Sequence, residues 1–145
     1  MSQSDDIPSC VFCNIAHGRD EKTTLLYNDE GFVVFRDRKP ASKHHYLVCP
    51  VKHVKDAKQL KKADIDLVQQ LVTVGKQVLT EQGGDVNTAR LGFHWPPLAL
   101  INHLHLHVIA PETDMGFLAR QIFRSNSYWF VSPDSLIERL EKMEE

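Results

Sequence analysis

The sequence predicts one α+β domain with an antiparallel sheet of about five strands, a long helix and flanking short helices. Polar and apolar residues alternate strictly over residues 103–108, as they do in a half-buried strand. Apolar residues recur at helical spacing between residues 63 and 82, which predicts the long helix. Proline, glycine and asparagine lie between the other short segments, as is typical of turns.

The chain begins with a predicted short helix and a hairpin. Residues 9–17 read as a helix that Ser9 can cap and Gly18 can end. Strands at residues 24–28 and 32–37 flank a turn that contains asparagine and glycine, which favours a hairpin.

The third strand precedes the long helix. It covers residues 45–49 and stops at Pro50, because proline cannot donate to a ladder. The long helix at residues 63–82 ends at a glycine pair. The remaining predicted elements are strands at residues 88–94 and 103–110, a helix at 115–125, an extended segment at 128–131 and a helix at 134–144.

Size and composition suit a single small domain. The chain has 145 residues, of which residues 1–8 are predicted to be flexible and residues 9–145 to form one domain. Its 42% hydrophobic and 25% charged residues exclude wholesale disorder. The net charge of −2 supplies no basic excess, so a long nucleic acid is not expected as a partner.

The N-terminal residues lack the apolar core of a signal peptide, and no apolar run approaches the ~20 residues that span a bilayer. We therefore expect a cytoplasmic protein, also present in the nucleus, without a membrane partner. In that reducing setting Cys10, Cys13 and Cys49 are expected to be thiols or metal ligands rather than disulfide partners.

Three histidines share one face of the predicted strand at residues 103–110. Successive side chains of a strand point to opposite faces, so His103, His105 and His107 lie on one face, roughly 7 Å apart. Like charges at this spacing lower one another's pKa, so at least one imidazole is expected to be neutral near pH 7.

This histidine pattern has three interpretations. The imidazoles could line a solvated face, or they could bind a metal, as alternate histidines of strands do in some zinc sites. They could also attack phosphorus, because a neutral imidazole splits one difficult displacement into two easier ones. We favour the third interpretation, an enzyme that breaks bonds to phosphorus.

The motif His103-Leu-His105-Leu-His107-Val-Ile resembles the signature of the histidine-triad (HIT) superfamily. The similarity runs from the Cys-Val-Phe-Cys segment at residues 10–13, through residues 45–53, to the triad. Two further segments, residues 92–97 and 126–130, are similar to a vertebrate nucleotide-binding branch of that family. The resemblance implies a HIT-like fold.

The resemblance also implies catalytic roles. His105 would attack the α-phosphorus of an adenylylated substrate, and hydrolysis of the nucleotidyl-histidine would release AMP. His107 would donate a hydrogen bond beside the phosphate. His45 would face the triad, although it could also be an ordinary first residue of a strand.

The nucleotide site follows from the same resemblance. Asp37 would hold the ribose hydroxyls, since a carboxylate can accept two hydrogen bonds, or it could cap the turn after the second strand. His94 would lie near the phosphate. The apolar slot around the base would consist of residues that composition alone would place in the core: Phe12, Ile15, Phe35 and Leu47.

One position departs from the family pattern. Relatives often carry a serine three residues before the triad, where its hydroxyl reaches the phosphate or leaving group, and this chain has Leu100. Leucine cannot donate a hydrogen bond, so protonation of the leaving group would fall to His107 or water. Asn102 could substitute only if the strand bulges.

A structural zinc ion is the one cofactor that the resemblance implies. Cys10 and Cys13 could be two buried thiols, but several family members bind zinc through such a pair and two histidines, which correspond here to His53 and His103. Two sulfurs and two nitrogens form a closed tetrahedral set. Cys49 is assigned to the core.

The leading functional hypothesis is an adenosine 5'-monophosphoramidase that hydrolyses AMP joined through nitrogen to lysine, ammonia or a simple amine. The alternatives are aprataxin-like deadenylation of nucleic-acid ends, dinucleoside polyphosphate cleavage, and an AMP-binding sensor with little turnover. Family members commonly form homodimers through the long helix, for which an apolar face is available: Ile65, Val68, Val72 and Leu79. The segment with Tyr128 and Trp129 is a candidate cover for the active site.

Overall fold

The structure is a computed structural model that describes residues 6–95 and 101–143. Its sheet contains six strands: β1 (Leu25–Asn28), β2 (Phe32–Arg36), β3 (His44–Pro50), β4 (Arg90–His94), β5 (Leu106–Ala110) and β6 (Phe130–Val131). Its α-helices are α1 (Val11–Ala16), α2 (Ile65–Glu81), α3 (Phe117–Ile122) and α4 (Pro133–Glu141). The prediction of an α+β chain with an antiparallel sheet and one long helix is confirmed.

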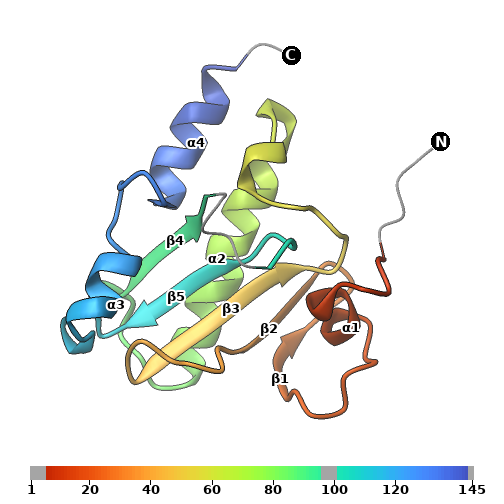
Figure 1. Ribbon diagram of the computed structural model, residues 1–145, viewed down its shortest axis with the longest axis horizontal. Coiled ribbons are helices and arrows are strands. Elements are labelled where there is room, and N and C mark those ends of the chain that lie inside the picture. The colour runs from red at the N-terminus through yellow and green to blue at the C-terminus, as the bar shows by residue number, and fades with distance from the viewer. Residues whose placement is uncertain (1–5, 96–100, 144–145) are drawn as a thin grey trace.

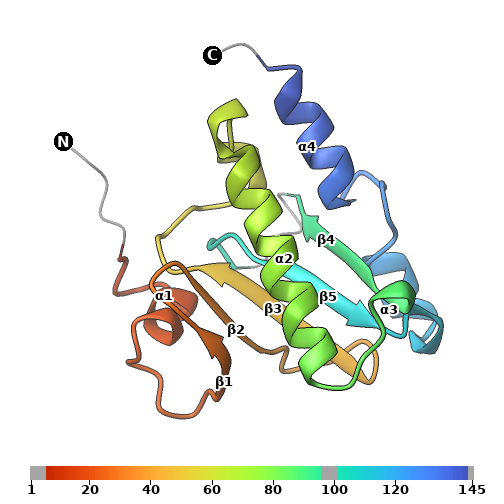
Figure 2. The same cartoon turned by 180° about the vertical axis from the view of Figure 1, so that it is seen from behind.

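The sheet has the order β1-β2-β3-β5-β4-β6, and every neighbouring pair is antiparallel. Helix α2 crosses one face of the sheet, and α4 lies beside α2 (Figures 1 and 2). The main core lies between α2 and this face. Gly75 brings the helix close, because a Cβ there would lie 2.9 Å from a methyl group of Val108.

The sixth strand corrects the predicted count of about five. β6 is only two residues long, and it pairs with β4 through Phe93–Val131 and His94–Phe130. Two residues are too few to show a period in the sequence, so only the free edge of β4 turns this segment into a strand. A side chain at Gly92 would collide with the ring of Phe130, so glycine permits this pairing.

Two predicted boundaries were also wrong. β5 begins at Leu106 rather than at residue 103, because the backbone N–H of Leu104 donates to Val54 O (2.6 Å) instead of joining the ladder. The cap of α1 is Cys10 rather than Ser9: Cys10 Sγ accepts from the backbone N–H of Cys13 at 3.3 Å.

The face of α2 that was predicted to join two copies is divided in the structure. Val68 and Leu79 are completely buried in the chain's own core, whereas Ile65 and Val72 are only partly buried. Because Val68 and Leu79 are buried within one chain, they cannot contribute to an interface between two copies. The homodimer itself stays a prediction. No helix among the described residues is long and apolar enough to cross a membrane.

Candidate active site

The two-faced arrangement of the histidine segment is confirmed, although only its last residues belong to β5. Leu104, Leu106 and Val108 pack into the core beneath α2. The imidazoles lie on the opposite face, where the ring centroids of His105 and His107 are 4.9 Å apart. The two rings are closer than the roughly 7 Å expected from the spacing along a strand, so both imidazoles can contact the same bound chemical group.

The backbone fixes the orientation and the tautomer of His105. Its Nδ1 lies 2.7 Å from the carbonyl oxygen of His103, and because a carbonyl can only accept, Nδ1 carries the proton. The neutral ring therefore has its lone pair on Nε2, where attack on phosphorus would begin. The ring is partly exposed and meets the edge of Phe12, with centroids 5.0 Å apart.

A second chain of hydrogen bonds fixes His107 in the opposite tautomer. The backbone N–H of Ala41 donates to Nδ1 of His45 at 2.9 Å, so neutral His45 carries its proton on Nε2. That Nε2 lies 2.9 Å from Nδ1 of His107, which must accept. Neutral His107 therefore carries its proton on Nε2, a buried atom without a hydrogen-bond partner among the described residues. A lone pair on His105 thus stands beside a free donor on His107.

Burial keeps this pair of histidines neutral. It is the main reason why the pKa of His107 lies well below its ordinary value, and neighbouring histidines lower it further. Burial also lowers the pKa of His45 to about 4, against the opposing effect of the Asp37 carboxylate. The expectation of neutral imidazoles therefore holds, but its main cause is loss of hydration rather than repulsion between like charges.

We expect the folded state to lose stability as the pH falls from about 6.5 to 4. The unfolded chain protonates His45 near pH 6.5, whereas the folded chain does so only near 4, so the stabilisation is complete above pH 6.5 and lost below 4. The loss from His45 alone is about 3 kcal/mol. Urea unfolding at several pH values measures it. His45→Asn should flatten the dependence, and equal slopes for both proteins would contradict the assignment.

Asp37 lies beside these histidines and caps a turn, one of the two roles predicted for it, while its binding of the ribose hydroxyls stays a prediction. Its Oδ1 accepts from the backbone N–H of Lys39 at 2.8 Å, which is the turn cap. Its Oδ2 lies 3.4 Å from Nε2 of His45. The turn therefore holds the Asp37 carboxylate next to the histidines.

The four residues of the predicted base slot form one apolar cluster between α1 and strands β2 and β3. Phe12, Ile15, Phe35 and Leu47 are all buried in it, as composition alone suggested. Phe12 also contacts His105, so the cluster adjoins the triad. On another side of His105 lies a half-open depression of about 210 Å³, including space open to solvent, with His94 in its lining.

Two aromatic residues of the site were missed by the sequence analysis. Phe123 lies with its ring centroid 5.3 Å from that of His45 and 5.0 Å from those of His94 and His107. Phe130 contacts His94 and His107. They cover the histidines in place of Tyr128, which is exposed. No local pattern marks either residue, because both reach the site through the fold of the C-terminal segment.

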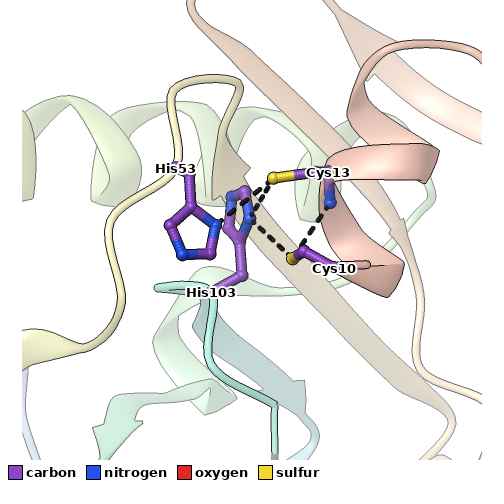
Figure 3. Close-up of side chains that lie close together, drawn as sticks. All are labelled: Cys10, Cys13, His53 and His103. Atoms are coloured by element: carbon purple, nitrogen blue, oxygen red, sulfur yellow. Dashed lines mark hydrogen bonds between the residues drawn. The ribbon is translucent and has the colours of Figure 1, made fainter. Parts of the chain in front are cut away.

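The predicted zinc ligands converge at one end of α1. Figure 3 shows the sulfurs of Cys10 and Cys13 turned toward the rings of His53 and His103. Nδ1 of His103 lies 3.4 Å from each sulfur, and Nδ1 of His53 lies 3.3 Å from Cys13 Sγ. Ordinary zinc bond lengths in a tetrahedron require about 3.6 Å between nitrogen and sulfur. These residues therefore fit a zinc ion.

The positions of the ring protons distinguish the predicted zinc ligands from a second cluster of possible metal ligands. Nε2 of His103 donates to Pro50 O at 2.8 Å, which leaves the Nδ1 lone pair facing the sulfurs, as a metal ligand requires. Asp37, His45 and His107 also lie close enough to hold a metal. However, Ala41 forces the proton of neutral His45 onto Nε2, the atom that would have to ligate. Only the cysteine-containing group has its lone pairs in place.

Comparison with known proteins shows which family the sequence and the fold resemble. The family model described as "Scavenger mRNA decapping enzyme C-term binding" matches residues 9–123. Adenosine 5'-monophosphoramidase HINT3 of Xenopus tropicalis is 47% identical over 134 residues, which are 92% of this chain and 88% of the relative. The same-named mouse protein is 46% identical and is covered to 82%. A histidine-triad protein structure from Clostridium difficile has a TM-score of 0.66 at 27% identity, covering 72% of this chain and 91% of that one.

The chain belongs to the histidine-triad family. Its HIT fold brings together His45, His94, His105 and His107, which lie in three separate segments of the sequence. Leu100, where other HIT proteins often carry serine, lies outside the described residues. Asn102 is exposed on a bend rather than in a strand.

Proposed function

We propose that this HIT protein hydrolyses adenosine 5'-phosphoramidates through a covalent nucleotidyl-histidine at His105, releasing AMP. One observation carries the proposal: the ring of His105, with its lone pair on Nε2, lies 4.9 Å between centroids from the ring of His107, whose buried Nε2–H has no partner among the described residues. Such a pair of groups suits attack on phosphorus with stabilisation of the charge that develops on its oxygens. The names of the relatives support adenosine phosphoramidates as the substrate class.

The proposed reaction has two displacements. In the first, Nε2 of His105 forms a bond to the α-phosphorus as the phosphorus–nitrogen bond breaks, and the departing amine takes up a proton from water. In the second, water adds to phosphorus and gives up a proton to solvent, the bond to Nε2 breaks, and AMP leaves with the imidazole restored. His107 donates to a phosphoryl oxygen in both steps, while His45 holds it in the required tautomer.

Zinc has a structural role in this proposal. Cys10, Cys13, His53 and His103 would hold the ion, and with four protein ligands it supplies no open position for water. The ring of His103 would bind the ion while its carbonyl accepts from Nδ1 of His105. His103 would therefore link zinc binding to the orientation of the proposed nucleophile, His105. We retain cytoplasmic and nuclear location and the homodimer as parts of the proposal.

The experiment combines turnover with trapping of the intermediate. The wild-type chain is mixed with a fluorogenic adenosine phosphoramidate, and alkaline quenching within the first turnover, which preserves a phosphorus–nitrogen bond to imidazole, is followed by mass spectrometry of the peptide that contains His105. We expect AMP release and a peptide carrying one adenylyl group. AMP release without an adduct at any quench time would favour direct attack by water. Affinity for AMP without turnover would favour the sensor hypothesis.

A further inference from the structure

Helix α3 (Phe117–Ile122) is poorly held by its own side chains. It has six residues, none of them buried, and Phe117 and Leu118 are 77% and 74% exposed. A helix this short is not stable by backbone hydrogen bonding alone. Something else must therefore hold it in place beside the histidines.

Three side chains bind the carbonyl groups at the C-terminal end of α3. The indole of Trp129 donates to Gln121 O at 2.8 Å. His94 donates from Nε2 to Ile122 O at 3.0 Å, and Arg90 donates to Phe123 O at 3.2 Å. The last carbonyls of a helix lack partners within the helix, so these donors satisfy groups that would otherwise need water.

Arg90 links this end of α3 to a second anchor. The same guanidinium forms an ion pair with Glu112, with 2.7 Å between nitrogen and oxygen. Arg90 lies on β4, the strand that also carries His94, so the rigid sheet sets the position of Phe123. This tether explains why Phe123 is buried although the helix before it is exposed.

The ring of Phe123 contacts three imidazoles, one of which is that of His107, whose Nε2–H has no partner among the described residues. Its centroid lies 5.0–5.3 Å from those of His45, His94 and His107. It thereby keeps water from the hydrogen bond between His45 and His107, on which the tautomer of His107 depends. A hydrogen bond in a dry site is stronger than one in contact with water.

We propose that Phe123, tethered by Arg90, is a positioning residue of the active site that holds His107 against His45 in the tautomer required for catalysis. This inference rests on the proposed function, in which Nε2–H of His107 donates to the phosphoryl group. It adds the end of α3 to the machinery of the reaction, although no residue of that helix reaches the nucleophile.

The first test compares Phe123→Ala with Phe117→Ala, the same substitution on an exposed ring of the same segment. We expect Phe123→Ala to lower kcat roughly 10- to 100-fold with a smaller change in KM, because the donor matters most in the transition state. Phe117→Ala should retain wild-type kinetics. Wild-type kcat in Phe123→Ala, or equal losses in both variants, would overturn the proposal.

The second readout is independent of activity. NMR titration of the ring protons follows His45 and His107 in the free protein, where His107 faces His45, His94 and His105, and His45 also faces Asp37. We expect Phe123→Ala to move both titrations toward the ordinary histidine range, whereas a purely structural residue would leave them in place. If the wild-type chain hydrolyses no phosphoramidate, the proposed function fails, and this titration still decides the role of Phe123.

Should Phe123→Ala not fold, Arg90 provides the alternative variant. Arg90→Gln removes the donor to Phe123 O and the ion pair together, whereas Glu112→Gln removes only the ion pair. We expect the first to lower kcat and shift the two titrations, and the second to leave both near wild type. An equal loss of kcat in both variants would assign the effect to the ion pair. Wild-type kcat in both variants would show that Arg90 is not needed, so either outcome would overturn the tether.

Discussion

His105→Asn is expected to lower AMP release from an adenosine phosphoramidate by roughly 10⁴-fold or more. An asparagine amide can still donate to the carbonyl of His103, so the local backbone should be retained, but it has no lone pair that can attack phosphorus. Binding of AMP, measured by calorimetry, should change little, because the cluster beside the nucleophile is untouched. Release of AMP and affinity for AMP are therefore measured on the same preparation.

His17→Asn is the matched control for this variant. His17 is an exposed residue at the C-terminal end of α1, so the same substitution there should leave turnover unchanged. Retained turnover in His105→Asn would show that another group, or water, attacks phosphorus. An inert wild-type chain that still binds AMP would instead direct attention to Leu100 and to nucleotide sensing.

Removal of zinc is expected to have the largest effect on stability. We expect about one zinc ion per chain, and Cys13→Ser should abolish it and lower the free energy of unfolding by roughly 4 kcal/mol or more. Cys13 lies on α1 and is completely buried against the two histidines, so loss of the ion would leave unpaired polar groups there. Metal analysis and urea unfolding measure the two quantities.

Cys49→Ala is the control, because Cys49 is also completely buried but belongs to the apolar cluster rather than to the ligand group. It should retain the full metal content. A chelator should lower the Tm of the wild type before it lowers turnover, since the ion is not placed to act on substrate. If adding zinc to a metal-free preparation left its Tm unchanged, that result would contradict the zinc site.

Much of the architecture follows from the sequence by itself. Alternation over Leu104–Val108 separated the core face from the histidine face, because a strand's period of two is a local property. The spacing of Val68, Leu71 and Val78 likewise predicted a helix with one apolar face, which in the structure packs in the main core. The histidine motif and the paired cysteines supplied the candidate nucleophile and the metal ligands, since each is a short pattern of chemically distinctive residues.

Only the tertiary structure decided how these groups are protonated and covered. The tautomer of His107 depends on the backbone N–H of Ala41, four residues before His45 and far from the triad in sequence. The position of Phe123, which shields the histidines from water, depends on Arg90, a residue of β4 that donates a hydrogen bond to the carbonyl oxygen of Phe123. Hydrogen bonds and burial between distant segments leave no period in the sequence, because their partners are chosen by the packing of the whole chain.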